Sequence, residues 1–147
     1  MTRTGYGLAA VMIIIMTAGC DESLKKFAGP TPDLEPTFSS IQQDIFNATD
    51  SAGRLACTGC HNATGARFNG MNLTGTTAYA TIVNVASVGK PSAIRVVPGN
   101  PDASYLLQKI EGAPGIAGVR MPQTPPYLTP NQIAIIRRWI ELGAPNN

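Results

Sequence analysis

Four segments of the chain repeat apolar residues at the three- and four-residue spacing of an amphipathic α-helix. Between them lie stretches rich in glycine, proline and asparagine, which favour turns and loops. The stretch 95–97 is too short to assign, so the pattern predicts a small all-α domain with long loops. The apolar positions of the four segments are Phe38, Ile41, Ile45 and Phe46; Tyr79, Ile82, Val83 and Val85; Leu106, Leu107 and Ile110; and Ile133, Ile136, Trp139 and Ile140.

The last segment has the clearest boundaries. Thr129 is a preferred N-cap residue, Pro130 follows at the first helical position, and Gln132 completes a capping box. Gly143 ends the pattern. We therefore expect a helix between Thr129 and Gly143.

The boundaries of the other three helices follow from similar signals. The first begins at Thr37 or Ser39, and Ser39 has the spacing of a capping box with Gln42. The second covers about residues 77–86. The third begins near Asn100, with a proline at its first position.

An apolar run of 11 residues, Leu8 to Ala18, precedes the helical segments and follows a positive charge at Arg3. As a helix it would rise only about 16 Å, roughly half of the hydrocarbon core of a bilayer. The pattern therefore predicts an export signal over residues 1–19. The small residues before Cys20 resemble a bacterial lipobox, except that Thr17 stands where leucine is usual. The resemblance implies cleavage before Cys20 and lipid attachment to its sulfur; a plain signal peptide with an incidental cysteine is the alternative.

Residues 20–36 hold three prolines among mixed charges and predict an extended tether, which leaves 37–147 as the folded domain. The net charge of +2 is too small to suggest a nucleic-acid partner. We expect the domain to lie outside the cytoplasm, in the periplasm or at the cell surface, anchored to a membrane by lipid.

The most specific chemical motif is Cys57-Thr58-Gly59-Cys60-His61. Two thiols at this spacing can each add to one vinyl group of a haem, and the histidine that follows then lies under the iron as a ligand. Such attachment takes place outside the cytoplasm, in agreement with the predicted export signal. The motif predicts one covalent haem c held by Cys57, Cys60 and His61.

Three other interpretations of the cysteine pair carry less weight. A thioredoxin-like centre would lie in a βαβ pattern, which is not evident here. Structural zinc normally takes four ligands, and the chain offers only Cys57, Cys60 and His61 nearby. A disulfide between the two cysteines would close a very small, strained loop.

His61 is the only histidine, so this chain cannot supply a second imidazole to the iron. The sixth ligand is then a methionine, or the position is open or filled from outside. Met71 lies ten residues after His61, a short path around the edge of a haem, whereas Met121 lies sixty residues on in a loop rich in glycine and proline. We favour Met121, and core packing is the alternative role for either methionine. A thioether ligand raises the reduction potential and suits electron transfer.

Further motifs accompany the cysteine pair. They are Tyr79-Ala80 with Val83-Asn84; Arg95-Val96-Val97-Pro98-Gly99 followed by Pro101 and Ser104-Tyr105-Leu106; Arg120-Met121-Pro122; and Ile136, Trp139-Ile140 and Gly143-Ala144. With these motifs, residues 37–144 resemble a class I mono-haem cytochrome c, especially the planctomycete-type and related bacterial forms.

The resemblance implies a cytochrome c fold in which several helices wrap one haem and the first and last helices cross. It also implies that Met121 is the distal ligand. The two haem propionates need donors, for which Arg95 and Tyr105 are candidates; the alternatives are an exposed arginine and a core tyrosine. Trp139 is expected to pack the last helix against the haem side of the core.

The predicted function is electron transfer between larger redox proteins. The chain has no second histidine for acid–base catalysis and no evident catalytic triad or phosphate-binding loop, so we expect neither an enzyme nor a small-molecule substrate. Two alternatives stay open. One is a haem enzyme or gas sensor with an open distal site, and the other is an electron-transfer subunit of a larger redox complex.

Overall fold

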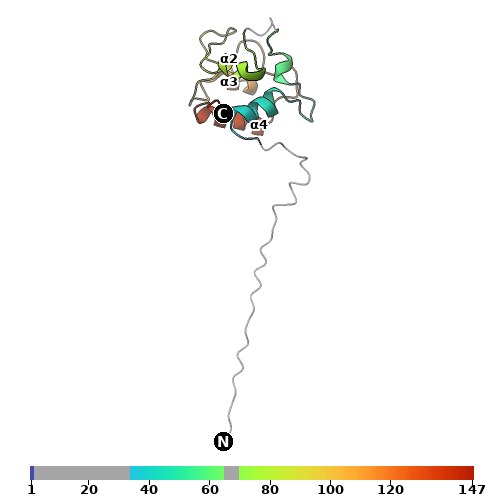
Figure 1. The fold of residues 1–147 in the computed structure, drawn as a ribbon, viewed down its shortest axis with the longest axis vertical. Coiled ribbons are helices and arrows are strands. Elements are labelled where there is room, and N and C mark those ends of the chain that lie inside the picture. Colours follow the sequence, from blue (N-terminus) through green and yellow to red (C-terminus); the bar gives the residue numbers. More distant parts are fainter. Residues whose placement is uncertain (2–33, 65–69) are drawn as a thin grey trace. The chain divides into compact units, whose positions relative to one another are not determined.

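The computed structural model describes Met1, residues 34–64 and residues 70–147. The chain divides into two units, and the second, Pro32–Asn147, holds all of the described helices (Figure 1). The predicted export signal, Cys20 and the predicted tether as far as residue 33 lie outside the described residues. None of the helices in the described ranges is long and apolar enough to span a membrane.

The regular elements of the described chain are helical, which confirms the predicted all-α class. Bridge pairing of the β type is limited, in these residues, to two isolated bridges, Val83–Val96 and Ala86–Ile94. In chain order the helical elements are α1 (Phe38–Ser40), η1 (Ile41–Phe46), η2 (Cys57–Gly59), η4 (Gly75–Thr77), α2 (Ala78–Ile82), α3 (Tyr105–Glu111) and α4 (Pro130–Glu141).

The first helix begins after Thr37, whose hydroxyl oxygen accepts a hydrogen bond from the Ser40 N–H at 3.2 Å. The predicted capping box between Ser39 and Gln42 is wrong. The Gln42 side-chain amide instead donates to the carbonyl oxygen of Leu73 at 2.7 Å. The helix then continues with π-helical hydrogen bonds through η1.

The second predicted helix is shorter than the sequence pattern indicated. It ends at Ile82 because Val83 is extended and Asn84 has a positive φ of 57°. The backbone can then pair with the segment around Val96, whose N–H donates to the Ile82 carbonyl at 3.0 Å.

The third helix also begins later than predicted, at Tyr105. The residues from Asn100 to Ala103 form a turn instead of the first helical turn. The hydroxyl of Ser104 donates to the Asn100 carbonyl at 2.8 Å and accepts from the Val97 N–H at 2.9 Å, which stabilises that turn.

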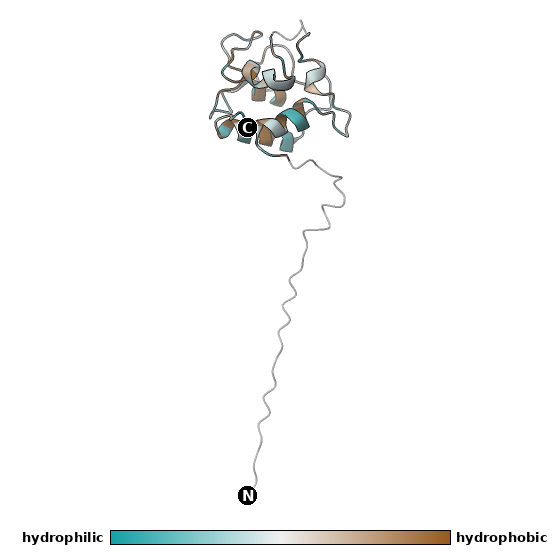
Figure 2. Ribbon diagram, viewed as in Figure 1, coloured by the Kyte–Doolittle hydropathy of each residue, from teal (hydrophilic) through white to brown (hydrophobic). Residues whose placement is uncertain are grey.

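The last helix, α4, confirms the prediction at both ends. The Thr129 hydroxyl accepts from the Gln132 N–H at 3.2 Å, and the Gln132 side chain accepts from the Thr129 N–H at 2.9 Å, so the capping box is complete. Gly143 follows the helix at φ 94°. Figure 2 shows that α4 carries both apolar and polar residues, as an amphipathic helix does.

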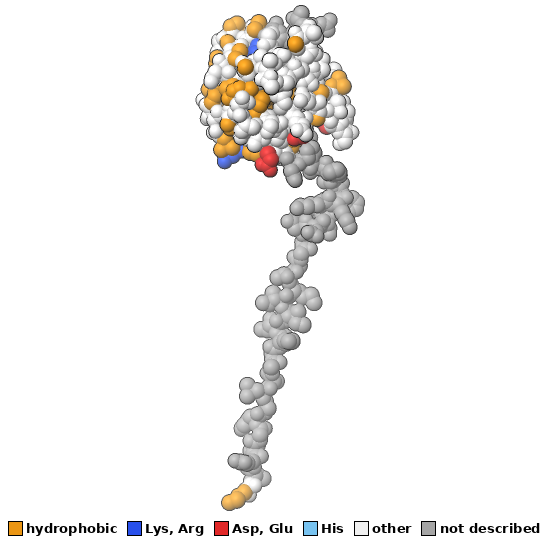
Figure 3. Space-filling view, in the orientation of Figure 1, with side chains coloured by type: hydrophobic (Ala, Val, Ile, Leu, Met, Phe, Trp, Pro, Cys, Tyr) orange, Lys and Arg blue, Asp and Glu red, His pale blue; other side chains and the backbone are white. Residues whose placement is uncertain are grey.

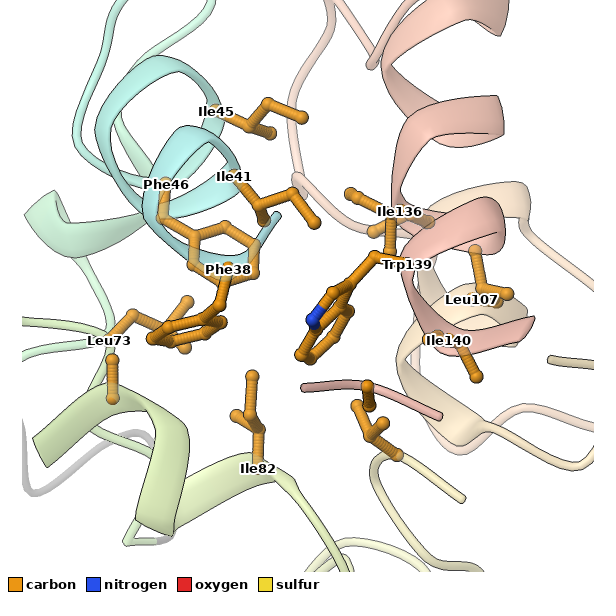
Figure 4. Close-up of a cluster of buried hydrophobic side chains, with 14 of the residues drawn as sticks. Phe38, Ile41, Ile45, Phe46, Leu73, Ile82, Leu107, Ile136, Trp139 and Ile140 are labelled. Carbon is orange, nitrogen blue, oxygen red and sulfur yellow. The ribbon is translucent and has the colours of Figure 1, made fainter. Parts of the chain in front are cut away.

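The core forms where the first and last helices pack together. Phe38 and Ile41 lie opposite Trp139 and Ile136 of α4 (Figure 4), and the rings of Phe38 and Trp139 are 5.6 Å apart. Trp139 is fully buried, and its Nε1 donates to the Pro145 carbonyl at 2.8 Å. Charged side chains are sparse on the face drawn in Figure 3, in keeping with a charged fraction of only 14%.

Candidate functional site

A cavity of about 390 Å³ lies between η2, α3 and the loop that follows α3. Its size falls within the range of about 300–1,000 Å³ that is typical of small-molecule and cofactor sites. Its lining is mostly apolar and brings together Cys57, Cys60, His61, Met71 and Met121. All four haem-binding residues predicted in the folded domain thus line one cavity, together with the second candidate methionine.

The charged side chains that line the cavity are all positive. Arg95 and Lys109 line the cavity, and none of its described lining residues is an aspartate or glutamate. Burial lowers the pKa of each of these two cations, because the charged form is costly away from water. An apolar occupant with negative groups would match this lining.

The cysteine motif forms a tight turn at the cavity wall. The N–H groups of Cys60 and His61 both donate to the Cys57 carbonyl, at 3.1 and 2.8 Å, and the Asn62 side chain donates to the Thr58 carbonyl at 3.1 Å. Cys57 is half-buried and Cys60 is exposed, and both are free thiols rather than a disulfide. The hydrogen bonds close this turn, and its two cysteines and its histidine all line the cavity.

His61 is half-buried, and its pKa is lowered by burial first and by the charges of Arg95 and Lys109 second. Burial and neighbouring cations both disfavour the charged imidazolium form, so both lower the pKa. Both effects favour the neutral imidazole, which is the form that binds metal ions.

Arg54 lies next to the cysteine motif, and the sequence pattern did not predict its position. Its guanidinium is buried beside Cys57, with Nη1 3.9 Å from the Cys57 sulfur. Burial raises the pKa of the Cys57 thiol, and the charge of Arg54 lowers it in part. The only signal in the sequence is an aspartate–arginine pair, Asp50 and Arg54, at a spacing of four residues just before the motif.

The two methionines reach the cavity from different segments. The segment that carries Met71 is held close to the cysteine motif, because the Leu73 N–H donates to the His61 carbonyl at 2.9 Å. Met121 comes from the loop after α3, where its N–H donates to the Lys109 carbonyl at 2.8 Å.

Side chains of α3 hold the loop that carries Met121. The Lys109 Nζ donates to the Ala117 carbonyl at 2.8 Å and to the Val119 carbonyl. The Tyr105 hydroxyl accepts from the Ala117 N–H at 2.8 Å. The sequence pattern did not predict the role of Lys109, because an amphipathic pattern places it on a polar face.

Arg95 and Tyr105, the two propionate candidates, both line the cavity and are buried, with 6% and 5% of their surfaces exposed. The alternative of an exposed arginine is therefore wrong. Arg95 Nη1 donates to the Thr81 carbonyl at 2.5 Å and to the Gly70 carbonyl at 3.3 Å.

Trp139 packs the last helix into the core, as expected. It contacts Phe38 of α1, and the α4 residue that lines the cavity is Ile136.

Among the described residues, no group of three or more His, Cys, Asp and Glu side chains is arranged to hold a metal ion. Compared with known proteins, the chain gives no significant match to a family model, a curated protein or a solved structure.

Proposed function

We propose that the chain is a c-type cytochrome that holds one covalent haem and transfers single electrons outside the cytoplasm. One observation carries the proposal. Two thiols, an imidazole and two thioethers, from Cys57, Cys60, His61, Met71 and Met121, line one mostly apolar cavity whose charged lining residues are cations.

The residues present fit a haem in their chemistry. Cys57 and Cys60 would hold it through thioether bonds, and His61 would ligate the iron. Arg95 and Lys109 match the charge of two propionates. When bound, the haem supplies an iron atom that alternates between two oxidation states.

Met121 is the better of the two candidates for the distal ligand. Met71 follows the motif closely, and its segment is hydrogen-bonded to the backbone of His61, which favours the histidine side of the haem. Met121 belongs to a separate loop that α3 holds through Lys109 and Tyr105. A loop fixed in this way keeps a thioether in place during electron transfer.

The cavity reaches the molecular surface at an apolar margin. Leu55 and Val88 both line it and are 69% and 57% exposed. The buried apolar walls exclude water from most of the site, which tunes the potential of the iron, while the margin provides the route to a redox protein partner.

The remaining parts of the proposal concern the N-terminal segment. Export through residues 1–19 and lipid attachment at Cys20 would anchor the domain to a membrane, with the residues between Cys20 and the folded unit that begins at Pro32 as a tether. Neither a nucleic acid nor a small-molecule substrate is part of this function.

Expression of the full chain with cytochrome-maturation machinery tests the proposal. We expect a red protein whose haem stays attached after denaturation and gives a pyridine haemochrome spectrum with two thioether bonds. The double variant with Cys57→Ala and Cys60→Ala should retain no covalent haem. A colourless wild-type product under these conditions would overturn the proposal.

Binding of carbon monoxide to the reduced protein distinguishes electron transfer from the open-site alternative. An electron carrier with Met121 on the iron should bind carbon monoxide weakly, and Met121→Ala should bind it strongly. Strong binding by the wild-type protein would instead favour a haem enzyme or gas sensor.

A further inference from the structure

The side chain of Arg54 is almost completely buried, with only 1% of its surface exposed. Its guanidinium forms an ion pair with Asp50 at 3.2 Å and donates to the carbonyl oxygens of Ile45, Ala48 and Leu55, each at 3.2 Å. These contacts join the end of η1, the loop after it and the segment that enters the cysteine motif.

The loop between η1 and the motif is closed around the same ion pair. The Asp50 carboxylate accepts hydrogen bonds from the N–H groups of Ala52 and Arg54 at 3.0 and 2.9 Å, in addition to the one from the guanidinium. A buried charge is costly unless it is paired and hydrogen-bonded, and the guanidinium of Arg54 has both kinds of contact. Here the contacts fix the backbone that leads into Cys57.

Cys57 lies directly against this arrangement. Its sulfur is 3.9 Å from Arg54 Nη1 and 3.9 Å from the Ile45 carbonyl oxygen, which itself accepts from the same guanidinium. Cys60, by contrast, is exposed. The two thiols therefore differ in how firmly they are held, although the motif makes them look equivalent.

We propose that Arg54 is a positioning residue for haem attachment, which holds the sulfur of Cys57 at the cavity wall where it meets one vinyl group. This inference rests on the proposed function. In the step concerned, the S–H of Cys57 adds across the vinyl C=C bond: sulfur bonds to the carbon next to the ring, and the hydrogen goes to the terminal carbon. The addition consumes no oxidant or reductant. The sulfur of Cys60 reaches the other vinyl group without this support.

The test compares Arg54→Met, Arg54→Lys and Asp50→Asn in the full chain, produced with cytochrome-maturation machinery. Arg137→Met is the matched control, because Arg137 also forms ion pairs, with Asp102 and Glu111, but at the surface of α4. The readout is which thiol each holoprotein leaves unattached. Denaturation and alkylation mark a free cysteine, and peptide mass mapping identifies it. The pyridine haemochrome spectrum reports the number of vinyl groups that remain.

We expect Arg54→Met and Asp50→Asn to raise the fraction of haem attached through Cys60 alone by at least fivefold over wild type. Arg54→Lys should give an intermediate value, since it keeps the charge but not the planar set of donors, and Arg137→Met should match wild type. A purely structural role would lower the total yield and leave the ratio of the two attachment sites unchanged, which would overturn the inference.

Asp50→Asn preserves the size of the side chain. If the Arg54→Met protein does not accumulate, the ratio of the two attachment sites in Asp50→Asn tests the inference in its place. A wild-type protein without covalent haem would refute the proposed function itself. A wild-type protein with two thioethers, together with unchanged ratios in both variants, would refute only the role of Arg54.

Discussion

Replacing Lys109 by methionine should loosen the loop that presents Met121. The substitution keeps the length of the side chain and removes the Nζ that donates to the carbonyl oxygens of Ala117 and Val119. It leaves the hydrogen bond from the Met121 N–H to the Lys109 backbone carbonyl in place. The perturbation therefore acts on the loop without removing its direct link to α3.

The magnitude follows from the two lost hydrogen bonds. Each contributes about 1 kcal/mol net, because Ala117 and Val119 are exposed and their carbonyl groups can bond to water instead. Burial lowers the pKa of Lys109, so part of this stabilisation already offsets the cost of desolvating the ammonium group. We expect a net change of about 1–2 kcal/mol, which is roughly a fivefold to thirtyfold shift toward the loop conformation in which Met121 is displaced.

The assay is a titration of the reduced holoprotein with carbon monoxide, which competes with the thioether for the iron. Lys109→Met should raise the apparent affinity for carbon monoxide by the same factor, and Met121→Ala sets the upper limit. Arg138→Met is the control, since Arg138 forms only an exposed ion pair with Glu141 at 3.2 Å. An affinity of Lys109→Met equal to that of wild type would refute the argument, and a larger effect of Met71→Ala than of Met121→Ala would refute the choice of ligand.

Three further substitutions test the packing and the helix boundaries by chemical denaturation. Trp139→Ala should lower the free energy of unfolding by about 3–5 kcal/mol, as expected for a fully buried aromatic residue, whereas Leu142→Ala, at a position 51% exposed, should change it by less than about 0.5 kcal/mol. Thr129→Ala should cost about 1 kcal/mol through loss of the N-cap, and Thr129→Ser should restore most of it. Gly112→Ala should cost at least about 1 kcal/mol, because φ is 75° there and the new Cβ would lie 2.9 Å from Arg120 Cδ. Values near zero for Trp139→Ala, Thr129→Ala or Gly112→Ala would contradict the corresponding contact.

The helix that the sequence predicted best is the one whose boundaries are local. Thr129, Pro130 and Gln132 determine the start of α4 through contacts within three residues of one another, so the pattern alone was sufficient. The second helix was predicted too long because it ends through a non-local contact. Its last residue, Ile82, accepts a hydrogen bond from Val96, and no propensity within 77–86 contains that information.

The residues of the candidate site also differ in whether local sequence predicts their position. The cysteine motif is contiguous, so its chemistry could be inferred from spacing alone. Arg54 and Lys109 were missed because most of their partners are backbone carbonyl groups, which every residue has and which leave no trace in a sequence pattern. An arginine in a turn and a lysine on a helix are both expected at the surface, and only the fold shows that Lys109 lines the cavity and that Arg54 lies beside Cys57.

These two cations indicate how a domain with so few long helices maintains a defined site. The pairing of α1 and η1 with α4 supplies the apolar core, and the segments that carry Cys57 and Met121 pack against it. Each of these segments is held by one cation, Arg54 or Lys109, through hydrogen bonds to its carbonyl groups. Within the described part of the chain, Trp139 does not line the cavity and shares no hydrogen-bond or ring partner with Lys109. It follows that these two substitutions should combine additively: Trp139→Ala should lower the free energy of unfolding by the same amount with or without Lys109→Met, and Lys109→Met should change the affinity for carbon monoxide by the same factor in both backgrounds.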